Sequence, residues 1–356
     1  MNKLTLIIDM NWLTISRFSV LSKGFEITNP EHIKQSTQAE LEELMARSIN
    51  VILNRFPAID NIVMVADGGS WRKQIPVPSQ LSDTTYKGNR ALDTDMDWGY
   101  IYGALNNILD NASEQGITVS RHPNLEGDDW VWYWSRRLNC DNVNCIIWSS
   151  DNDLKQLIQI DKNTNAFTAW YNDKNGLWLP DSIKRPDDPI EFFMSFEYFS
   201  PILESIKKNI EVNYINPDTI INSKVICGDA GDNIMPVFRY KKGSRTFRIT
   251  EKVWEEISKE LNINTIYDLT DKWDDVANRI CNHSKFSPHS PNKELIREMI
   301  DYNRKLVWLN ELVIPDTAIQ AMNQQEYQVF DVPYIRNNYK SLLKANDDIQ
   351  SLFEGI

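Results

Sequence analysis

The chain has 356 residues, of which 38 are Lys or Arg and 50 are Asp or Glu, so its net charge is −12. Its 42% hydrophobic and 11% aromatic content excludes a disordered, collagen-like or membrane-spanning chain. The length predicts roughly two domains, at about 150 residues per domain. The acidic balance alone would disfavour a nucleic-acid-binding protein, because affinity for phosphate comes largely from Lys and Arg.

The beginning of the chain and its cysteines bear on the compartment. The first ten residues lack a basic segment followed by a small-residue cleavage site, so we expect no export signal. The four cysteines lack C-x-x-C spacing, and the near-cluster of Cys281, His283 and His289 has no second pair that would complete a zinc site. We expect a cytoplasmic protein with reduced thiols.

Three short apolar runs, at residues 4–9, 61–67 and 143–151, each end in an aspartate. Such runs are typical of strands buried on both faces of a parallel sheet. Helical patterns at 38–54, 100–113 and 128–138 alternate with them, which predicts an α/β fold with a mostly parallel central sheet and flanking helices. Because sites in such sheets lie beyond the carboxyl ends of the strands, Asp9, Asp67 and Asp151 should meet there.

In the third helical pattern, Trp130 and Trp134 fall at helical spacing with Val131 and Leu138. This spacing favours packing in the core over a platform for base stacking, which is the alternative.

From about residue 185 the pattern becomes mainly helical, with helices expected at 251–261, 292–309 and 334–348. The prolines between residues 179 and 189 interrupt both helix and strand. We therefore predict a catalytic domain at 1–185 and a mostly helical domain at 186–356.

Acidic residues gather at the predicted ends of elements. Asp151 and Asp153 are two apart where a strand ends, and Asp229 and Asp232 are three apart at a helix entry, so each pair can present two carboxylates in one direction. Gathered carboxylates raise one another's pKa, a cost that hard cations such as Mg²⁺ remove. The candidate ligands are Asp9, Asp67, Glu126, Asp128, Asp129, Asp151, Asp153, Asp229 and Asp232. The alternative is a set of capping acids on an ordinary α/β protein.

Basic residues lie between and after these acids. Arg72 and Lys73 come first, and Tyr86 precedes Lys87 and Arg90, which share one face if the segment is helical. Residues 239–248 then carry five basic side chains and no acid, at Arg239, Lys241, Lys242, Arg245 and Arg248. Such a patch fits contact with a duplex backbone, although a solvated surface loop is the plainer alternative.

In this order, the motifs resemble the 5′-nuclease superfamily of flap endonuclease-like enzymes, and most closely the ribonuclease H type of T-even bacteriophages. The matching segments are LIIDMN (6–11), WRK (71–73), YKGNR (86–90), LEGDD (125–129), SSDNDLKQL (149–157), GDAGDNI (228–234) and YNRKLVWLNELVIPDTA (302–318). The resemblance implies a PIN-like nuclease core, followed by a variant helix-hairpin-helix at about 224–257 that holds duplex.

The resemblance also implies roles for single residues. One Mg²⁺ would be surrounded by Asp9, Asp67, Glu126, Asp128 and Asp151. A second would be held by Asp153, Asp229 and Asp232, with Asp129 near either ion and Mn²⁺ able to substitute. Asp128 and Asp151 would act in catalysis, Lys87 and Arg90 would grip the scissile phosphate, and Tyr86 would stack on a terminal base. These last three would lie at the base of a helical arch at about 88–110.

One segment departs from the family pattern. After Ile234 the chain has no glycine before Gly243, so backbone clamping of the duplex by a glycine-rich hairpin is not expected. The basic side chains from Arg239 to Arg248 would substitute for it.

The function implied is that of a Mg²⁺-dependent 5′→3′ exonuclease and flap or fork endonuclease acting on RNA/DNA hybrids and duplex DNA. It would remove RNA primers during phage replication, in the host cytoplasm, as a monomer with no membrane contact and with single-strand-binding protein as a partner. The end of the chain, 349–356, resembles a tail that binds a sliding clamp through Gln350, Leu352 and Phe353, or else packs on its own domain. The rival functions are a PIN-like single-strand ribonuclease and a non-catalytic fork-binding protein.

Overall fold

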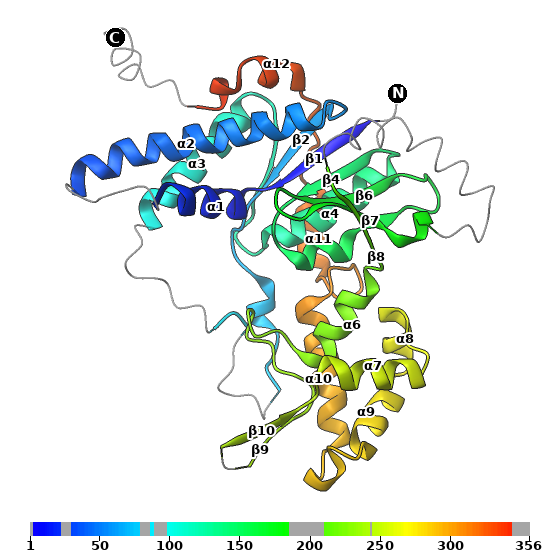
Figure 1. Cartoon of the computed structure of the whole chain (residues 1–356). Helices are drawn as coiled ribbons and strands as arrows, with labels where there is room; N and C mark the ends of the chain where they lie inside the picture. The colour runs from blue at the N-terminus through cyan, green and yellow to red at the C-terminus, as the bar shows by residue number, and fades with distance from the viewer. Residues whose placement is uncertain are drawn as a thin grey trace.

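The computed structural model describes residues 3–22, 30–78, 86–88, 98–184, 210–242 and 244–343. A helix-flanked sheet forms the upper part of the molecule and a group of helices forms the lower part, as Figure 1 shows. None of the helices among these residues combines the length and apolar character needed to cross a membrane.

The central sheet has the strand order β3-β2-β1-β4-β6-β7-β8, with β5 paired to β6. The strands are β1 (Leu4–Asp9), β2 (Asn61–Val65), β3 (Thr118–Ser120), β4 (Asn144–Trp148), β5 (Gln159–Ile160), β6 (Phe167–Asn172), β7 (Gly176–Pro180) and β8 (Val212–Ile215). β1 lies between β2 and β4 and runs parallel to both. β6 pairs antiparallel with β7, and the pairs β2/β3, β4/β6 and β7/β8 are parallel, so the predicted mostly parallel sheet is confirmed.

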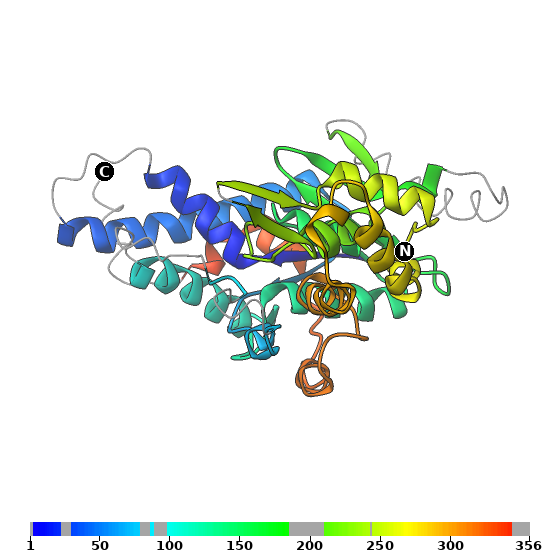
Figure 2. The ribbon, with the colours of Figure 1, turned by 90° about the horizontal axis from the view of Figure 1, so that it is seen from below.

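Successive side chains of β1 enter different cores. Leu6 and Ile8 pack against α1 (Met10–Ser22), α2 (Pro30–Arg55) and α3 (Trp98–Glu114) on one face of the sheet. Ile7 packs against α4 (Gly127–Cys140) and α11 (Asp316–Asn323) on the other face. Figure 2 shows helices on both sides of the sheet. The burial of Trp130 and Trp134 in the second core confirms that they are packing residues.

The lower part of the molecule has its own hydrophobic core. Its helices are α6 (Asp218–Cys227), α7 (Glu251–Glu260), α8 (Ile266–Asp271), α9 (Trp273–Asn282) and α10 (Lys293–Val307). A two-stranded ribbon, β9 (Arg239–Lys242) with β10 (Arg245–Arg248), separates α6 from α7 and projects from the lower end in Figure 1. The predicted segment 224–257 is therefore the end of a helix, a β-ribbon and a second helix.

The predicted division at residue 185 does not separate the two cores. β8 completes the upper sheet from beyond that point, and α11 packs on the sheet as well. After α11, the short helices α12 (Val332–Asn337) and η6 (Tyr339–Leu342) join the core of α2 and α3. Residues 218–308, together with Tyr86, form the lower core, so the two predicted domains are interleaved in the chain.

Two helix predictions are corrected. The helix expected at 334–348 ends at Asn337, because Asn338 has φ −144° and leaves the helical region; residues 344–348 lie outside the described residues. Part of the predicted arch at 88–110 is the packed helix α3, whose apolar side chains Ile101, Leu105 and Ile108 are buried. Residues 89–97 lie outside the described residues.

Candidate active site

The carboxyl ends of β1 and β4 are tied together through Asp9 and Ser149. Asp9 is the last residue of β1, and its carboxylate accepts hydrogen bonds from the Ser149 hydroxyl at 2.7 Å and from the Trp12 backbone N–H at 3.0 Å. The same hydroxyl accepts from the backbone N–H of Asp151 at 3.0 Å. The Asp151 carboxylate accepts from the Asp153 N–H at 2.8 Å and caps the short helix η3 (Asn152–Leu157). The two strand ends therefore hold Asp9 and Asp151 next to each other.

The end of β2 is tied in the same way to the start of α4. Asp67 lies two residues beyond β2, and its Oδ1 accepts a hydrogen bond from the Gly127 backbone N–H at 2.6 Å. A Cβ atom on residue 127 would lie 3.1 Å from that oxygen, so the close approach favours glycine. Asp128, the next residue of α4, is thereby brought to the same edge of the sheet as Asp9.

The electrostatics of this edge are those of like charges held together. Burial, with repulsion from Asp67 and Asp151, raises the pKa of Asp9 to about 7, although its hydrogen bonds oppose the rise. Burial and the nearby Asp151 likewise raise the pKa of Asp128 well above its ordinary value, and Lys87 only partly offsets this. Such carboxylates are stabilised by a cation.

Glu126 and Asp129 instead belong to a buried ion-pair network. The Arg72 guanidinium, 2% exposed, lies 2.9 Å from Glu126 Oε2 and 2.8 Å from Asp129 Oδ1, and it donates to the Leu306 carbonyl at 3.0 Å. The second oxygen of Asp129 accepts from the Glu126 N–H at 3.0 Å and closes a capping box at the start of α4.

This network corrects two predicted roles. Asp129 is fully buried and bonded to Arg72, so its carboxylate does not face a metal site. The Arg72 guanidinium is buried among its protein partners, so it is not placed to contact nucleic acid. The neighbouring Lys73 is exposed and stays a candidate for that contact.

Tyr86 and Lys87 connect the upper and lower parts. Lys87 Nζ lies 2.7 Å from Glu126 Oε1, and the Lys87 backbone N–H donates to the Asp232 carbonyl at 2.9 Å. Burial alone would lower the pKa of Lys87, but Glu126, Asp128 and Asp232 outweigh it and raise that pKa. Tyr86 is 7% exposed and its hydroxyl donates to Glu126 at 3.2 Å, so it is not placed to stack on a base. Arg90 lies outside the described residues.

The second acidic group contains a cation that sequence reasoning missed. Lys224, in the last turn of α6, pairs with Asp153, and its Nζ lies 2.5 Å from Asp229 Oδ2. The only sequence signal was a lysine one helical turn and a half before Asp229. Asp232 belongs to the same turn as Asp229 and lies near Tyr86 and Lys87.

The chemistry of these residues fits divalent ions better than their placement does. Carboxylate oxygens are the ligands that Mg²⁺ prefers, and Asp9, Asp128 and Asp151 repel one another where a cation would relieve them. Within the described part of the chain, however, no three Asp, Glu, His or Cys side chains lie close enough together to hold an ion in their present positions. Ion binding would therefore draw these carboxylates together.

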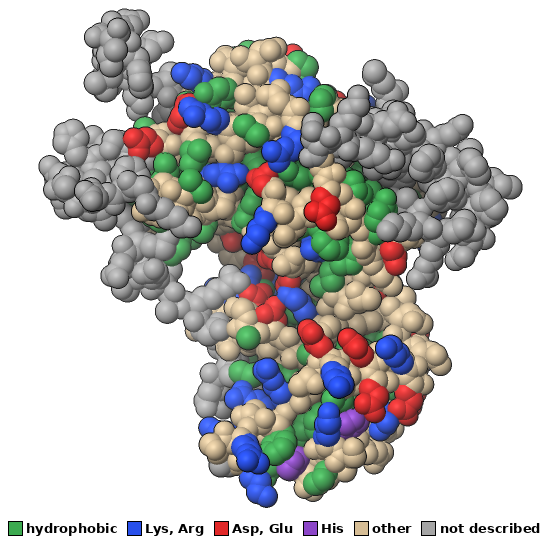
Figure 3. Space-filling model, in the orientation of Figure 1, with side chains coloured by type: hydrophobic (Ala, Val, Ile, Leu, Met, Phe, Trp, Pro, Cys, Tyr) green, Lys and Arg blue, Asp and Glu red, His purple; other side chains and the backbone are tan. Residues whose placement is uncertain are grey.

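The predicted basic patch forms the β9–β10 ribbon. All five basic side chains are exposed, and Figure 3 shows Lys and Arg side chains gathered at this lower end of the molecule. The cross-strand pair Tyr240 and Phe247 packs on His289, with Tyr240 stacked on the imidazole at 4.5 Å between ring centroids. Side chains alternate along a strand, so Arg239, Lys241 and Arg248 extend from the opposite face of the ribbon.

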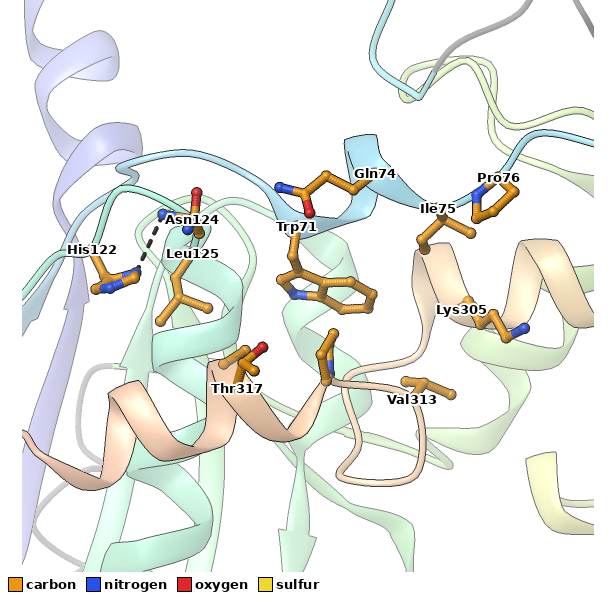
Figure 4. Close-up of a pocket in the computed structure, with 12 residues that line it drawn as sticks. Trp71, Gln74, Ile75, Pro76, His122, Asn124, Leu125, Lys305, Val313 and Thr317 are labelled. Carbon is orange, nitrogen blue, oxygen red and sulfur yellow. Dashed lines mark hydrogen bonds between the residues drawn. The ribbon is translucent and has the colours of Figure 1, made fainter.

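A pocket of about 430 Å³ lies behind the short helix η1 (Trp71–Gln74), between it and the start of α11. Figure 4 shows the Trp71 ring at its centre, facing Thr317 and Val313. None of the nine predicted carboxylates lines this pocket. It is separate from the candidate active site.

The predicted clamp-binding residues Gln350, Leu352 and Phe353 lie outside the described residues.

No family model matches the sequence, and no curated protein matches it by sequence. Solved structures do match. A T5 protein co-crystallised with metal ions is 15% identical, with a TM-score of 0.54, over 90% of this chain and 98% of that chain. T5 5′-exonuclease with bound zinc is 16% identical, with a TM-score of 0.54, over 90% and 97%.

The flap endonuclease of bacteriophage T5, in a pseudo-enzyme-product complex with DNA and metal ions, is 15% identical. Its TM-score is 0.52, and the match covers 96% of this chain and 99% of that chain. At these identities the likeness shows the fold, which is that of the 5′-nucleases.

Proposed function

We propose that the chain is a divalent-metal-dependent 5′ nuclease of the flap endonuclease type that hydrolyses phosphodiesters. One observation carries this proposal: the carboxylates of Asp9, Asp128 and Asp151 lie near one another at one edge of the sheet, beside Lys87. They repel one another, and the pKa values of Asp9 and Asp128 are raised. The fold shared with a metal-bound and DNA-bound T5 enzyme supports it.

In the proposed reaction, bound Mg²⁺ would neutralise the carboxylates and polarise the phosphodiester, which makes its phosphorus susceptible to attack by water. Asp9, Asp67, Asp128 and Asp151 would hold one ion, and Asp153, Asp229 and Asp232 a second. Ser149 orients both Asp9 and the start of the Asp151 turn. No side chain is needed as a general base.

Lys87 is the proposed contact to the scissile phosphate. Its ammonium now lies on Glu126, and the nearby acids keep it charged, so it can stabilise the negative charge that develops on the phosphate oxygens. Arg90 would assist it. Glu126 therefore has a positioning role toward Lys87 in addition to any contact with an ion.

The substrates we propose are 5′ ends and flaps in duplex DNA and in RNA/DNA hybrids, with a ribonuclease H type of activity. The basic β9–β10 ribbon and Lys73 would contact the duplex backbone. Primer removal in phage replication, helped by a sliding clamp on the tail 349–356 and by single-strand-binding protein, would be the biological role.

The test is cleavage of a 5′-labelled RNA/DNA hybrid and of a 5′-flap DNA, each with Mg²⁺ or with EDTA. Asp151→Asn should lower turnover by roughly 10³-fold or more while leaving binding nearly unchanged, because it removes an ion-facing carboxylate and no binding surface. Asp110→Asn, at an exposed acid of α3, is the matched control and should cleave normally. Tight fork binding with no cleavage of either substrate would replace this proposal with a non-catalytic fork-binding protein.

A further inference from the structure

A lysine ammonium occupies the centre of the second acidic group. Lys224 is 24% exposed and pairs with both Asp153 and Asp229. Asp153 lies in the first turn of η3, the next element after the central strand β4, whereas Lys224 and Asp229 belong to the lower part of the molecule. The ammonium therefore joins α6 to the edge of the sheet that carries the candidate active site.

Backbone hydrogen bonds hold the Asp229 carboxylate in its position. Asp229 pairs with Ile234 through two backbone hydrogen bonds of 2.9 and 2.7 Å, and its Oδ1 accepts from the Gly231 N–H at 2.8 Å. This leaves Oδ2 for Lys224. Asp153 belongs to η3, and η3 packs against α6, so this packing brings the two acids to the same ammonium.

One ammonium serves both acids at once. Lys224 Nζ donates to Asp153 Oδ1 and to Asp229 Oδ2, so each carboxylate has one oxygen in contact with the same positive charge. A cation shared in this way offsets the repulsion between two neighbouring carboxylates.

We propose that Lys224 is a built-in counter-ion, which neutralises Asp153 and Asp229 when no divalent ion is bound and competes with that ion for the same oxygens. This inference deepens the proposed function, since it assigns a residue that regulates occupancy of the second ion site. A divalent ion that enters must displace the ammonium. The affinity for that ion is thereby set lower than the acids alone would give.

Two opposite effects follow from removing the charge at residue 224. Lys224→Met keeps the length and the apolar stem, so the acids lose their counter-ion with little change in packing. Binding of Mn²⁺ to this site should tighten by about tenfold, the factor that corresponds to one hydrogen-bonded ion contact. In EDTA the same variant should melt at a lower temperature than the wild type, and saturating Mn²⁺ should remove the difference.

The experiment measures Mn²⁺ binding to the full chain without nucleic acid, by calorimetry and by the electron paramagnetic resonance signal of free Mn²⁺. Lys224→Arg keeps the charge and should bind Mn²⁺ like the wild type. Lys252→Met, at an exposed lysine of α7, controls for the loss of one positive charge. If Lys224→Met does not fold in EDTA, Lys224→Gln serves in its place, and rescue of either variant by Mn²⁺ supports the proposal.

Equal or weaker Mn²⁺ binding in Lys224→Met, with an unchanged melting temperature in EDTA, would overturn the counter-ion role. So would the absence of Mn²⁺ binding in both proteins. Absence of cleavage with Mn²⁺ binding and melting as expected would instead count only against the nuclease proposal.

Discussion

Replacing Arg72 with Met should destabilise the protein strongly. The guanidinium is 2% exposed and forms ion pairs with Glu126 at 2.9 Å and Asp129 at 2.8 Å, besides its hydrogen bond to the Leu306 carbonyl. Removing one partner of a buried pair leaves an uncompensated charge and costs about 3–5 kcal/mol. Here two carboxylates are left, although Lys87 still neutralises Glu126, so we expect a loss in that range.

The loss should also depend on pH. Burial opposes ionisation of Glu126, but Arg72 and Lys87 outweigh it and lower its pKa in the folded protein. A lowered pKa contributes stability that is present above the unfolded value, about 4.3, and is lost as the pH falls through the folded value. The difference between the wild type and Arg72→Met should therefore be full at pH 7 and shrink below about pH 4.3.

The assay is urea unfolding in EDTA at pH 7 and at pH 4, followed by tryptophan fluorescence and circular dichroism. Lys73→Met, at the exposed neighbour of Arg72, is the matched control and should change stability by less than about 0.5 kcal/mol. A loss below about 1 kcal/mol in Arg72→Met at pH 7, or a loss equal to that of the control, would mean that the buried ion pairs of Arg72 do not stabilise the fold.

Two further predictions concern the acids and the ribbon. The pKa of Asp9 is about 7 in the folded protein, so ionisation of its carboxylate opposes folding, and this effect grows as the pH rises from about 4 to 7. Asp9→Asn should therefore stabilise the protein in EDTA at pH 8 by about 1–4 kcal/mol. A lower urea midpoint for this variant would contradict the prediction. Replacing Arg239, Lys241 and Arg248 with Ala should weaken duplex binding and reduce the slope of log affinity against log salt by about 3. A triple variant of exposed lysines elsewhere in the lower part should keep the wild-type slope, as fluorescence anisotropy would show. These lysines are Lys252, Lys259 and Lys285.

The central strands and the acids that follow them could be predicted because both depend on local sequence. The apolar runs ending near Asp9, Asp67 and Asp151 have the composition of buried parallel strands, and the structure has β1, β2 and β4 there side by side. Parallel strands must place their carboxyl ends at one edge, so the meeting of these acids followed from topology.

The partners of the charged residues could not be predicted, because they depend on contacts between distant segments. Arg72 reaches Glu126 across 54 residues and Leu306 across 234, and no local pattern marks it as buried. Asp129 looks the same in sequence as Asp128, yet its place in the capping box turns it inward. Lys224 likewise meets Asp153 only because α6 packs on η3.

The return of the chain to the sheet also constrains how the protein can be made. Tyr327 bonds to Thr5 of β1 at 2.9 Å, and Arg336 donates to the backbone carbonyls of residues 56, 57 and 59. Val332, Ile335 and Leu342 complete the core of α2 and α3. During synthesis the apolar surface beside β1 therefore stays uncovered until more than 300 further residues have been made. A fragment cut at residue 185 would keep that surface open permanently and should aggregate.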